Sequence, residues 1–155
     1  MANNNWATPP DFLEEVRKEY GDYFDPCPWY HDLKLWDGLE IDWHPFNYVN
    51  PPYDMIGMTK FVQKGVYETI NDCLSLFLLP VSTSTKLFHN WIKPNNKMID
   101  FLDHRLRFIG INDKGQYVNY DQIQTITKET ILFEGKEIPK YIRASGRQDL
   151  MKVLI

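Results

Sequence analysis

The chain has 155 residues, which is the size of one domain, and we expect a single domain over residues 1–155. With 43% hydrophobic and 15% aromatic residues it can build a packed core, and this composition excludes an intrinsically disordered chain. No apolar run approaches the roughly 18 residues of a membrane span, and residues 1–5 are no signal peptide, so we expect a cytoplasmic protein without membrane contact. Cys27 and Cys73 form no Cys-x-x-Cys pattern, which fits a reducing compartment and predicts no metal site.

The net charge of -4 is unevenly distributed along the chain. Residues 1–85 contain 5 Lys and Arg against 13 Asp and Glu, a net of -8, whereas residues 86–155 contain 12 against 8, a net of +4. The acidic part suits a cationic ligand and the basic part suits nucleic-acid phosphates. The alternative is a chance asymmetry in a short chain.

The first predicted element is an amphipathic helix over residues 11–20, whose apolar residues recur at helical spacing. Thr8 is a suitable N-cap, prolines occupy the first helical positions, and Gly21 ends the helix. The predicted apolar face consists of Phe12, Val16 and Tyr20, or of Leu13 and Val16.

A short buried strand is predicted over residues 23–25, and it ends in Asp25 just before a proline. An acid at the carboxyl end of a parallel strand lies in the crevice where open α/β sheets bind ligands. Asp25 is therefore either a ligand-binding carboxylate or an acid that only shapes a turn. Residues 29–45 are rich in aromatic and acidic side chains and predict an irregular loop with a short helical turn.

The next strand, predicted over residues 46–49, ends abruptly in Asn50-Pro51-Pro52-Tyr53. Two prolines fix φ and remove two backbone donors, so the chain must leave the sheet in a rigid turn. The Asn50 amide oxygen and the Pro51 carbonyl can each accept an N–H bond from an amino group on a heteroaromatic ring, which would make its nitrogen nucleophilic. Tyr53 offers a flat face for stacking against a base taken out of its duplex. The alternative is an ordinary Pro-Pro turn that closes a strand.

Beyond residue 53, helices and strands are predicted to alternate. Residues 54–71 predict a helix, residues 74–80 a strand buried on both faces, residues 81–85 the cap of a second helix, and residues 98–102 another strand. This alternation predicts βαβ units and a parallel sheet. The predicted apolar faces of the two helices are Met55, Ile56, Met58, Phe61, Val62, Val66, Tyr67 and Ile70, and then Leu87, Phe88, Trp91 and Ile92.

Two further strands are predicted near the end of the chain, over residues 105–111 and 150–155. Between them, residues 112–147 form a polar excursion with several glycine-containing turn signals. A small hairpin between residues 131–133 and 141–142 is predicted within it. The excursion is a candidate recognition insertion within the single domain.

The order of the landmarks is more specific than any one of them. Trp-x-Thr-Pro, Phe-Asp-Pro-Cys, Gly-Leu-x-x-Asp-Trp, Val-Asn-Pro-Pro-Tyr, Leu-Leu-Pro-x-Ser-Thr-x-Thr-x-x-Phe-His and Ile-x-Phe-Leu-x-x-Arg-Leu-Arg-Phe follow one another. Over roughly residues 6–111, the chain resembles the compact, phage-associated family of DNA adenine-N6 methyltransferases, often called Dam-like. Chains of that kind are expected in bacteria or in phage-infected host cells.

The resemblance implies an α/β fold with a compact, reduced Rossmann-like sheet of the class I methyltransferase type and helices on its faces. It also implies direct transfer of a methyl group from S-adenosyl-L-methionine to the exocyclic amine of a flipped adenine. Positioning and hydrogen-bond polarisation would supply most of the catalysis, without a metal. The implied partner is double-stranded DNA.

The implied catalytic residues form one tetrapeptide: Asn50, Pro51, Pro52 and Tyr53. The residues implied at the cofactor precede the first helix or end the first strand: Trp6, Thr8, Pro9 and Asp25. Two loop acids are expected to close over the cofactor's adenine and ribose: Asp37 and Asp42. The residues expected beside the target base follow strand 74–80: Ser82, Thr83, Thr85, Phe88 and His89.

Arg105 and Arg107 occupy alternate positions of the predicted strand 105–111, so their side chains would share one face. They are predicted either to bind backbone phosphates or to form a solvated edge.

Several alternatives differ in substrate or in class. The same tetrapeptide serves methylation of cytosine N4, of adenine in RNA and of protein glutamine, and the basic second half of the chain favours nucleic acid over protein. A non-catalytic nucleic-acid-binding protein on a degenerate methyltransferase fold is also open, because no Gly-x-Gly loop follows Asp25. The sequence predicts no oligomeric state.

Overall fold

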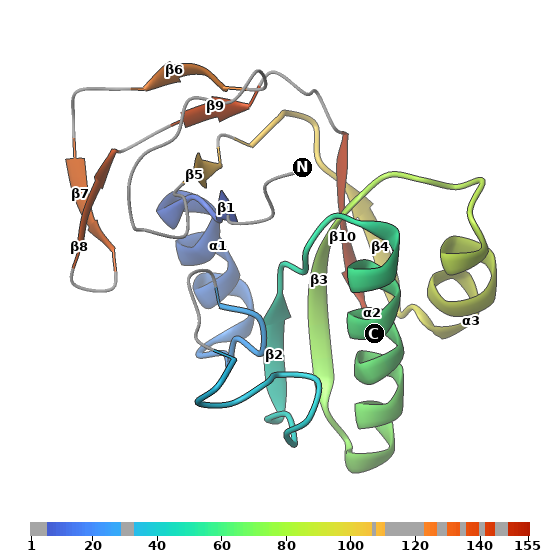
Figure 1. Ribbon diagram of the computed structural model, residues 1–155. Coiled ribbons are helices and arrows are strands. Elements are labelled where there is room, and N and C mark those ends of the chain that lie inside the picture. Colours follow the sequence, from blue (N-terminus) through green and yellow to red (C-terminus); the bar gives the residue numbers. More distant parts are fainter. Residues whose placement is uncertain are drawn as a thin grey trace.

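The structure is a computed structural model that describes residues 6–28, 33–106, 108–110, 123–126, 130–133, 136–139, 142–144 and 149–155. Within these residues the fold is mixed α/β, with a four-stranded open sheet and helices packed against it (Figure 1). The α/β class predicted from the sequence is therefore confirmed. None of the described helices is both long enough and apolar enough to cross a membrane.

The main sheet has the strand order β2-β3-β10-β4. Its strands are β2 (Phe46–Val49), β3 (Leu74–Pro80), β10 (Leu150–Leu154) and β4 (Met98–Phe101). β2 and β3 are parallel, whereas β10 is antiparallel to both β3 and β4. The prediction of a parallel sheet is thus right for β2, β3 and β4 but wrong for the last strand. An apolar run predicts a strand without its direction, which depends on the partners it pairs with.

The predicted strand over residues 23–25 is reduced to a single parallel bridge between Phe24 and Asn47. Phe24 N donates to Phe46 O at 3.0 Å, and Tyr48 N donates to Phe24 O at 2.9 Å. The strand extends no further because the next residue, Asp25, folds its carboxylate back to accept the backbone N–H of Cys27. Phe24 nevertheless borders β2 on the side away from β3, and it runs parallel to both strands.

Helix α1 (Pro10–Tyr20) begins after Pro9, which acts as the N-cap without a side-chain hydrogen bond. The prediction that Thr8 caps this helix is wrong, because the Thr8 hydroxyl bonds to residues of β2 and the turn after it. Gly21 ends the helix with φ 83°, as predicted, and a left-handed φ of this kind favours glycine. Three of the predicted apolar residues are buried against the sheet: Phe12, Leu13 and Val16.

Asp54 caps helix α2 (Met55–Glu68), because its side chain accepts the Gly57 N–H at 2.7 Å. The helix continues into the 3₁₀ turn η1 (Thr69–Asn71). The apolar face predicted for this helix is wider than the face that the structure buries. Ile56 and Ile70 are 70% and 81% exposed, because the sheet covers only the side of the helix that carries residues such as Phe61 and Val62.

The two helices cover opposite faces of the sheet, which makes three layers (Figure 1). Alternating strand residues divide between the two faces, as the period of two requires. Residues packed on the α2 side include Val49, Phe77, Leu79, Met151 and Val153. Residues packed on the α1 side include Tyr48, Leu76, Leu78 and Leu150.

The connection between β3 and β4 contains η2 (Phe88–Ile92), a π-helical turn, followed by α3 (Lys93–Asn95). The predicted cap is confirmed, because Thr85 Oγ1 accepts the Phe88 N–H at 3.2 Å. Single π-helical turns recur at functional sites. This connection leaves the carboxyl end of β3, beside the turn that holds Asn50.

Residues after β4 depart most from the prediction. The predicted strand 105–111 is represented by β5 (Ile109–Gly110), which pairs with β1 (Trp6–Ala7). Arg105 lies outside any strand and is exposed, so the prediction that it alternates with Arg107 along a strand is wrong. Arg107 itself lies outside the described residues.

The described parts of the excursion form two antiparallel pairs. β7 (Thr130–Phe133) pairs with β8 (Lys136–Pro139), and β6 (Ile123–Ile126) pairs with β9 (Ile142–Ala144). The predicted hairpin is therefore correct in its first strand and wrong in its second. β8 begins only three residues after β7 ends, so β7 pairs with β8 rather than with residues further along the chain.

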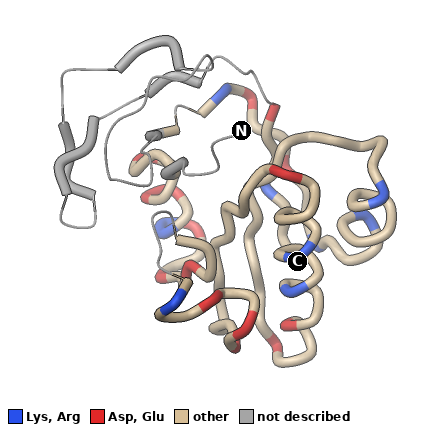
Figure 2. The backbone as a smooth tube through the Cα atoms, in the orientation of Figure 1, with Lys and Arg blue, Asp and Glu red and all other residues tan. Residues whose placement is uncertain are grey.

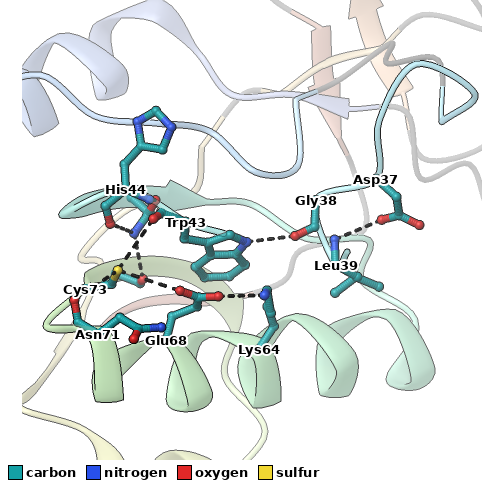
Figure 3. A network of polar contacts seen from close by, with 11 residues as sticks. Asp37, Gly38, Leu39, Trp43, His44, Lys64, Glu68, Asn71 and Cys73 are labelled. Atoms are coloured by element: carbon teal, nitrogen blue, oxygen red, sulfur yellow. Dashed lines mark hydrogen bonds and ion pairs between the residues drawn. The ribbon is translucent and has the colours of Figure 1, made fainter. Parts of the chain in front are cut away.

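A buried polar network fixes the loop before β2 at the amino edge of the sheet (Figure 3). Glu68 is only 4% exposed, and Lys64 Nζ lies 2.6 Å from its Oε1. Trp43 Nε1 donates to Gly38 O at 2.8 Å, and the Cys73 thiol lies near Trp43 O and Glu68 Oε2. Burial alone would raise the pKa of Glu68, but the hydrogen bond and charge of Lys64, with bonds from Trp43 and Asn71, lower it overall.

Gly38 brings this loop into contact with the chain near Asp25. A Cβ at this position would overlap with the Pro26 carbonyl oxygen, so only glycine allows the approach. Through Gly38, the polar network at the amino edge of the sheet thereby helps to position the chain near Asp25.

Candidate active site

The candidate active site lies at the carboxyl edge of the main sheet. Phe24, β2 and β3 run in the same direction, so the residues that follow them meet at one edge. Those residues are Asp25, Asn50 and the loop after Pro80. Open α/β sheets bind their ligands at this edge, which is where the sequence predicts the site.

Three side chains are joined by hydrogen bonds at this edge. Asn50 Nδ2 donates to Thr8 Oγ1 at 3.1 Å, and Thr8 Oγ1 lies 3.1 Å from the hydroxyl oxygen of Tyr48. Thr8 is 7% exposed and Tyr48 1% exposed. The segment before α1 is therefore tied through Thr8 to β2 and to the Asn50 turn.

The Asn50 amide oxygen has no such partner. Among the side chains that the structure describes, Asn50 Oδ1 is the one buried nitrogen or oxygen atom without a hydrogen bond. An unsatisfied buried acceptor costs about 1–3 kcal/mol, and native structures rarely retain one without a reason. Asn50 thus presents a desolvated acceptor at the edge where a ligand is expected.

Tyr53 is held in a fixed orientation beside Asn50. Its hydroxyl donates to Leu78 O at 3.1 Å, and its ring meets Phe108 edge to face, with centroids 6.2 Å apart. Burial raises the pKa of Tyr53 above its usual value of 10.0, so the phenol remains a neutral donor. Pro51 is buried and Pro52 is half-buried, which makes the whole turn rigid.

Asp25 and Asp37 are brought together around Cys27. Asp25 Oδ1 accepts the Cys27 N–H at 2.9 Å, and Asp37 Oδ1 accepts the Leu39 N–H at 2.9 Å. Burial, with the charges of these two acids, raises the pKa of Cys27 to about 12, so this thiol is no nucleophile at neutral pH. Burial raises the pKa of Tyr48, and the charge of Asp25 adds a smaller contribution in the same direction.

Asp42 does not join this group. It is exposed, and its charge acts on Cys73, whose pKa is raised by burial and by nearby acids that include Asp42. Cys73 directly precedes β3, so Asp42 lies at the amino edge of the sheet, away from Asn50.

The remaining residues predicted at the cofactor lie beside Thr8 in the chain. Trp6 belongs to β1, where it pairs with Gly110, and the buried Pro9 begins α1.

The loop after β3 is held by contacts within itself. His89 Nε2 donates to Thr83 O at 2.7 Å, and Thr85 Oγ1 donates to Ser82 O at 3.0 Å. Phe88 is half-buried against the core on the α2 side, whereas Ser82, Thr83 and His89 are exposed. The loop is therefore an ordered surface that follows β3 at the same edge as Asn50.

Tyr48 is the site residue that the sequence prediction missed. The sequence predicts Tyr48 only as part of a strand, but the period of two places its side chain on the same side as that of Asn50. That spacing is the signal that points to Tyr48. Within the part of the chain that the structure describes, no group of three or more His, Cys, Asp or Glu residues could hold a metal ion.

Comparisons with protein-family models, with curated proteins and with solved structures find no match to this chain. A functional assignment therefore depends on the chemistry of the residues at the carboxyl edge.

Proposed function

We propose that the protein is an S-adenosyl-L-methionine-dependent DNA methyltransferase that methylates N6 of a flipped adenine. The observation that carries the proposal is the buried, unpartnered Oδ1 of Asn50. An exocyclic amine would supply the missing N–H donor.

Two acceptors would hold the target amine. Asn50 Oδ1 and the Pro51 carbonyl oxygen each accept one N–H, which draws the nitrogen lone pair out of conjugation with the ring. Both acceptors belong to a turn that two prolines make rigid, so little reorganisation is needed during the reaction. The Tyr53 ring, fixed through its bond to Leu78 O, supports the base by stacking.

The charge of two acids at the carboxyl edge supports a site for the cofactor. Asp25 and Asp37 lie close together around Cys27, at the edge where parallel strands end. S-adenosyl-L-methionine carries a cationic sulfonium and an amino group, and when bound it supplies the methyl group. The two carboxylates would attract these cationic groups and orient the cofactor at the same edge of the sheet as Asn50.

The sheet supports a reduced Rossmann-like methyltransferase fold. Phe24, β2 and β3 are parallel neighbours, β4 runs the same way, and helices pack on both faces. A ligand edge formed by parallel strands is the feature such a fold requires.

A basic stretch beside the site supports a nucleic-acid substrate. Residues 81–97, which leave the carboxyl end of β3, contain three lysines and no Asp or Glu. Figure 2 shows only basic colouring around η2 and α3, in contrast to the mixed charges of α1 and the loop before β2. Exposed Lys86 and Lys93 would bind backbone phosphates, with exposed Ser82 and Thr83 nearer the base.

The test is transfer of a labelled methyl group to unmethylated duplex DNA, followed by nucleoside analysis. We expect N6-methyladenine from the wild-type protein, and a rate at least about 10²-fold lower for Asn50→Ala, because the principal acceptor of the amine is removed. Asn71→Ala removes an amide at the amino edge and serves as the matched control with an unchanged rate.

Any other outcome of this assay either changes the proposed substrate or contradicts the proposal. N4-methylcytosine, or a product formed only on RNA, would replace the proposed substrate with one of the alternatives. No methylated nucleoside and no cofactor binding would contradict the proposal and favour a non-catalytic nucleic-acid-binding protein.

A further inference from the structure

We infer that Thr8 and Tyr48 are positioning residues that hold the Asn50 amide with its oxygen toward the substrate, an inference that rests on the function proposed above. The three side chains come from two distant parts of the chain. Thr8 lies between β1 and α1, whereas Tyr48 and Asn50 belong to β2 and its turn. Asn50 Nδ2 lies 3.1 Å from Thr8 Oγ1, which lies 3.1 Å from the Tyr48 hydroxyl.

The orientation of the Asn50 amide decides whether the turn can bind an amine. The two ends of an amide are almost the same size, but the oxygen accepts hydrogen bonds and the NH2 only donates them. With the amide reversed, its NH2 would face the NH2 of the base, and neither could accept. The turn alone does not fix this choice, so a neighbouring group must.

Thr8 fixes the choice when its single hydroxyl proton is donated to the Tyr48 hydroxyl oxygen, 3.1 Å away. Thr8 Oγ1 can then only accept from Asn50. The amide must then offer its Nδ2–H to Thr8, which leaves Oδ1 at the edge of the sheet. Tyr48 acts through Thr8, and Thr8 acts through Asn50.

Burial makes this arrangement effective. Thr8 and Tyr48 are 7% and 1% exposed, so water does not readily replace either partner. Hydrogen bonds in such surroundings are stronger than in water, and successive bonds polarise one another. Pro9 and Pro10 directly follow Thr8, and they limit the movement of its backbone.

Thr8 could act in two ways, by positioning Asn50 or by contacting the cofactor. The sequence resemblance assigned Thr8 to the cofactor, whereas its hydroxyl is engaged by Asn50 and Tyr48. A positioning residue affects kcat, and a cofactor contact affects cofactor affinity.

The experiment compares the wild type with three variants: Thr8→Val, Thr8→Ser and Tyr48→Phe. For each protein, kcat is measured for methyl transfer to duplex DNA, and the dissociation constant of S-adenosyl-L-methionine is measured by calorimetry. Thr8→Val keeps the side-chain shape and removes the hydroxyl, so we expect kcat to fall about 10-fold or more, with cofactor affinity within about twofold. This loss is smaller than the roughly 10²–10³-fold decrease in kcat that follows when a direct hydrogen bond to the reacting group is removed. Thr8→Ser should restore most of the rate, and Tyr48→Phe should give a smaller loss than Thr8→Val.

The matched control loses a hydroxyl elsewhere. Thr69→Val removes a bond to Val66 O at the other edge of the sheet. This variant should retain the wild-type kcat. A second readout needs no activity: solvent exchange of the Asn50 side-chain NH2 protons, followed by NMR, should be slow in the wild type and faster in Thr8→Val.

Two results overturn the inference while the proposed function stands. One is an active wild-type protein whose kcat is unchanged in Thr8→Val and Tyr48→Phe. The other is a loss in Thr8→Val that falls on cofactor affinity and leaves both kcat and the NH2 exchange unchanged. A wild-type protein that neither binds the cofactor nor transfers a methyl group overturns the proposed function, and the positioning role with it.

Discussion

Two asparagines of the same strand region, Asn47 and Asn50, differ in how their amides are used. Asn47 is fully buried, and both ends of its amide are bonded. The oxygen accepts the His44 N–H at 3.0 Å. The NH2 group donates to His44 O at 2.8 Å and also contacts Leu74 O and Ser75 Oγ. Asn50 has one hydrogen bond, from Nδ2 to Thr8, and a buried oxygen with none. Asn47 completes its bonds within the fold, whereas the Asn50 oxygen has no partner there.

The same contrast separates the two edges of the sheet. At the amino edge, Glu68, Lys64, Trp43 and Asn47 form bonds that close the loop before β2 onto α2 and β3 (Figure 3). At the carboxyl edge, acids, a rigid turn and an open acceptor gather without a closed network. We propose that the amino edge contributes stability and that the carboxyl edge contributes function. Each prediction below tests one side of this contrast.

The largest loss of stability is expected for Asn47→Ala. The substitution removes the partner of the part-buried His44 N–H and of two carbonyl oxygens, and we expect the free energy of unfolding to fall by about 3 kcal/mol. Urea denaturation monitored by tryptophan fluorescence measures it. A loss below about 1 kcal/mol would show that the amide of Asn47 is not structural.

A smaller loss is expected for Lys64→Met. Glu68 would remain buried without its cation, which costs about 2–3 kcal/mol, at the low end for a broken buried pair because Lys64 is partly exposed. Adding Glu68→Gln to this variant should recover part of the loss, since a neutral amide needs no counter-charge. Urea denaturation of the two single variants and the double variant completes the cycle. Additive losses would contradict a direct ion pair.

The lowered pKa of Glu68 predicts a pH dependence of stability. The unfolded chain binds the proton more tightly than the folded protein, so the contribution of Glu68 is fully present above its ordinary pKa of 4.5. It is lost as the pH falls through the lower pKa of the folded protein. Thermal unfolding between pH 6 and about pH 3 should show a smaller decline for Glu68→Gln than for the wild type. Parallel declines would contradict the assignment.

The smallest effect on stability is expected for Asn50→Ala. The variant loses the bond to Thr8 but also removes a buried acceptor that has no partner, and these contributions nearly offset, within about 1 kcal/mol. Urea denaturation alongside Asn47→Ala gives the comparison under identical conditions. A loss as large as that of Asn47→Ala would mean that Asn50 is a structural residue.

Local features of the fold were predictable from the sequence. The Pro51-Pro52 pair marks the end of β2, the continuous apolar run marks β3, and Gly21 marks the end of α1, because each depends on residues close together in the chain. The carboxyl-edge position of Asp25 and Asn50 followed from those strands.

Features that depend on distant partners were not predictable. The antiparallel direction of β10 depends on pairing with β3 and β4 on both sides. Thr8 looks like a helix cap by local pattern, but a buried bond to Tyr48, 40 residues away, determines its place. Asp42 resembles Asp37 in its surroundings along the chain, yet the fold places it at the opposite edge.

Calorimetric titration of S-adenosyl-L-methionine tests the division between the two edges most directly. The wild-type protein is compared with Asp25→Ala, an acid at the carboxyl edge, and with Asp42→Ala, an exposed acid at the amino edge. We expect binding to the wild type and to Asp42→Ala with equal affinity, and clearly weaker binding to Asp25→Ala. Absence of binding to the wild-type protein, with or without duplex DNA, or equal affinity in Asp25→Ala, would contradict a cofactor site at the carboxyl edge.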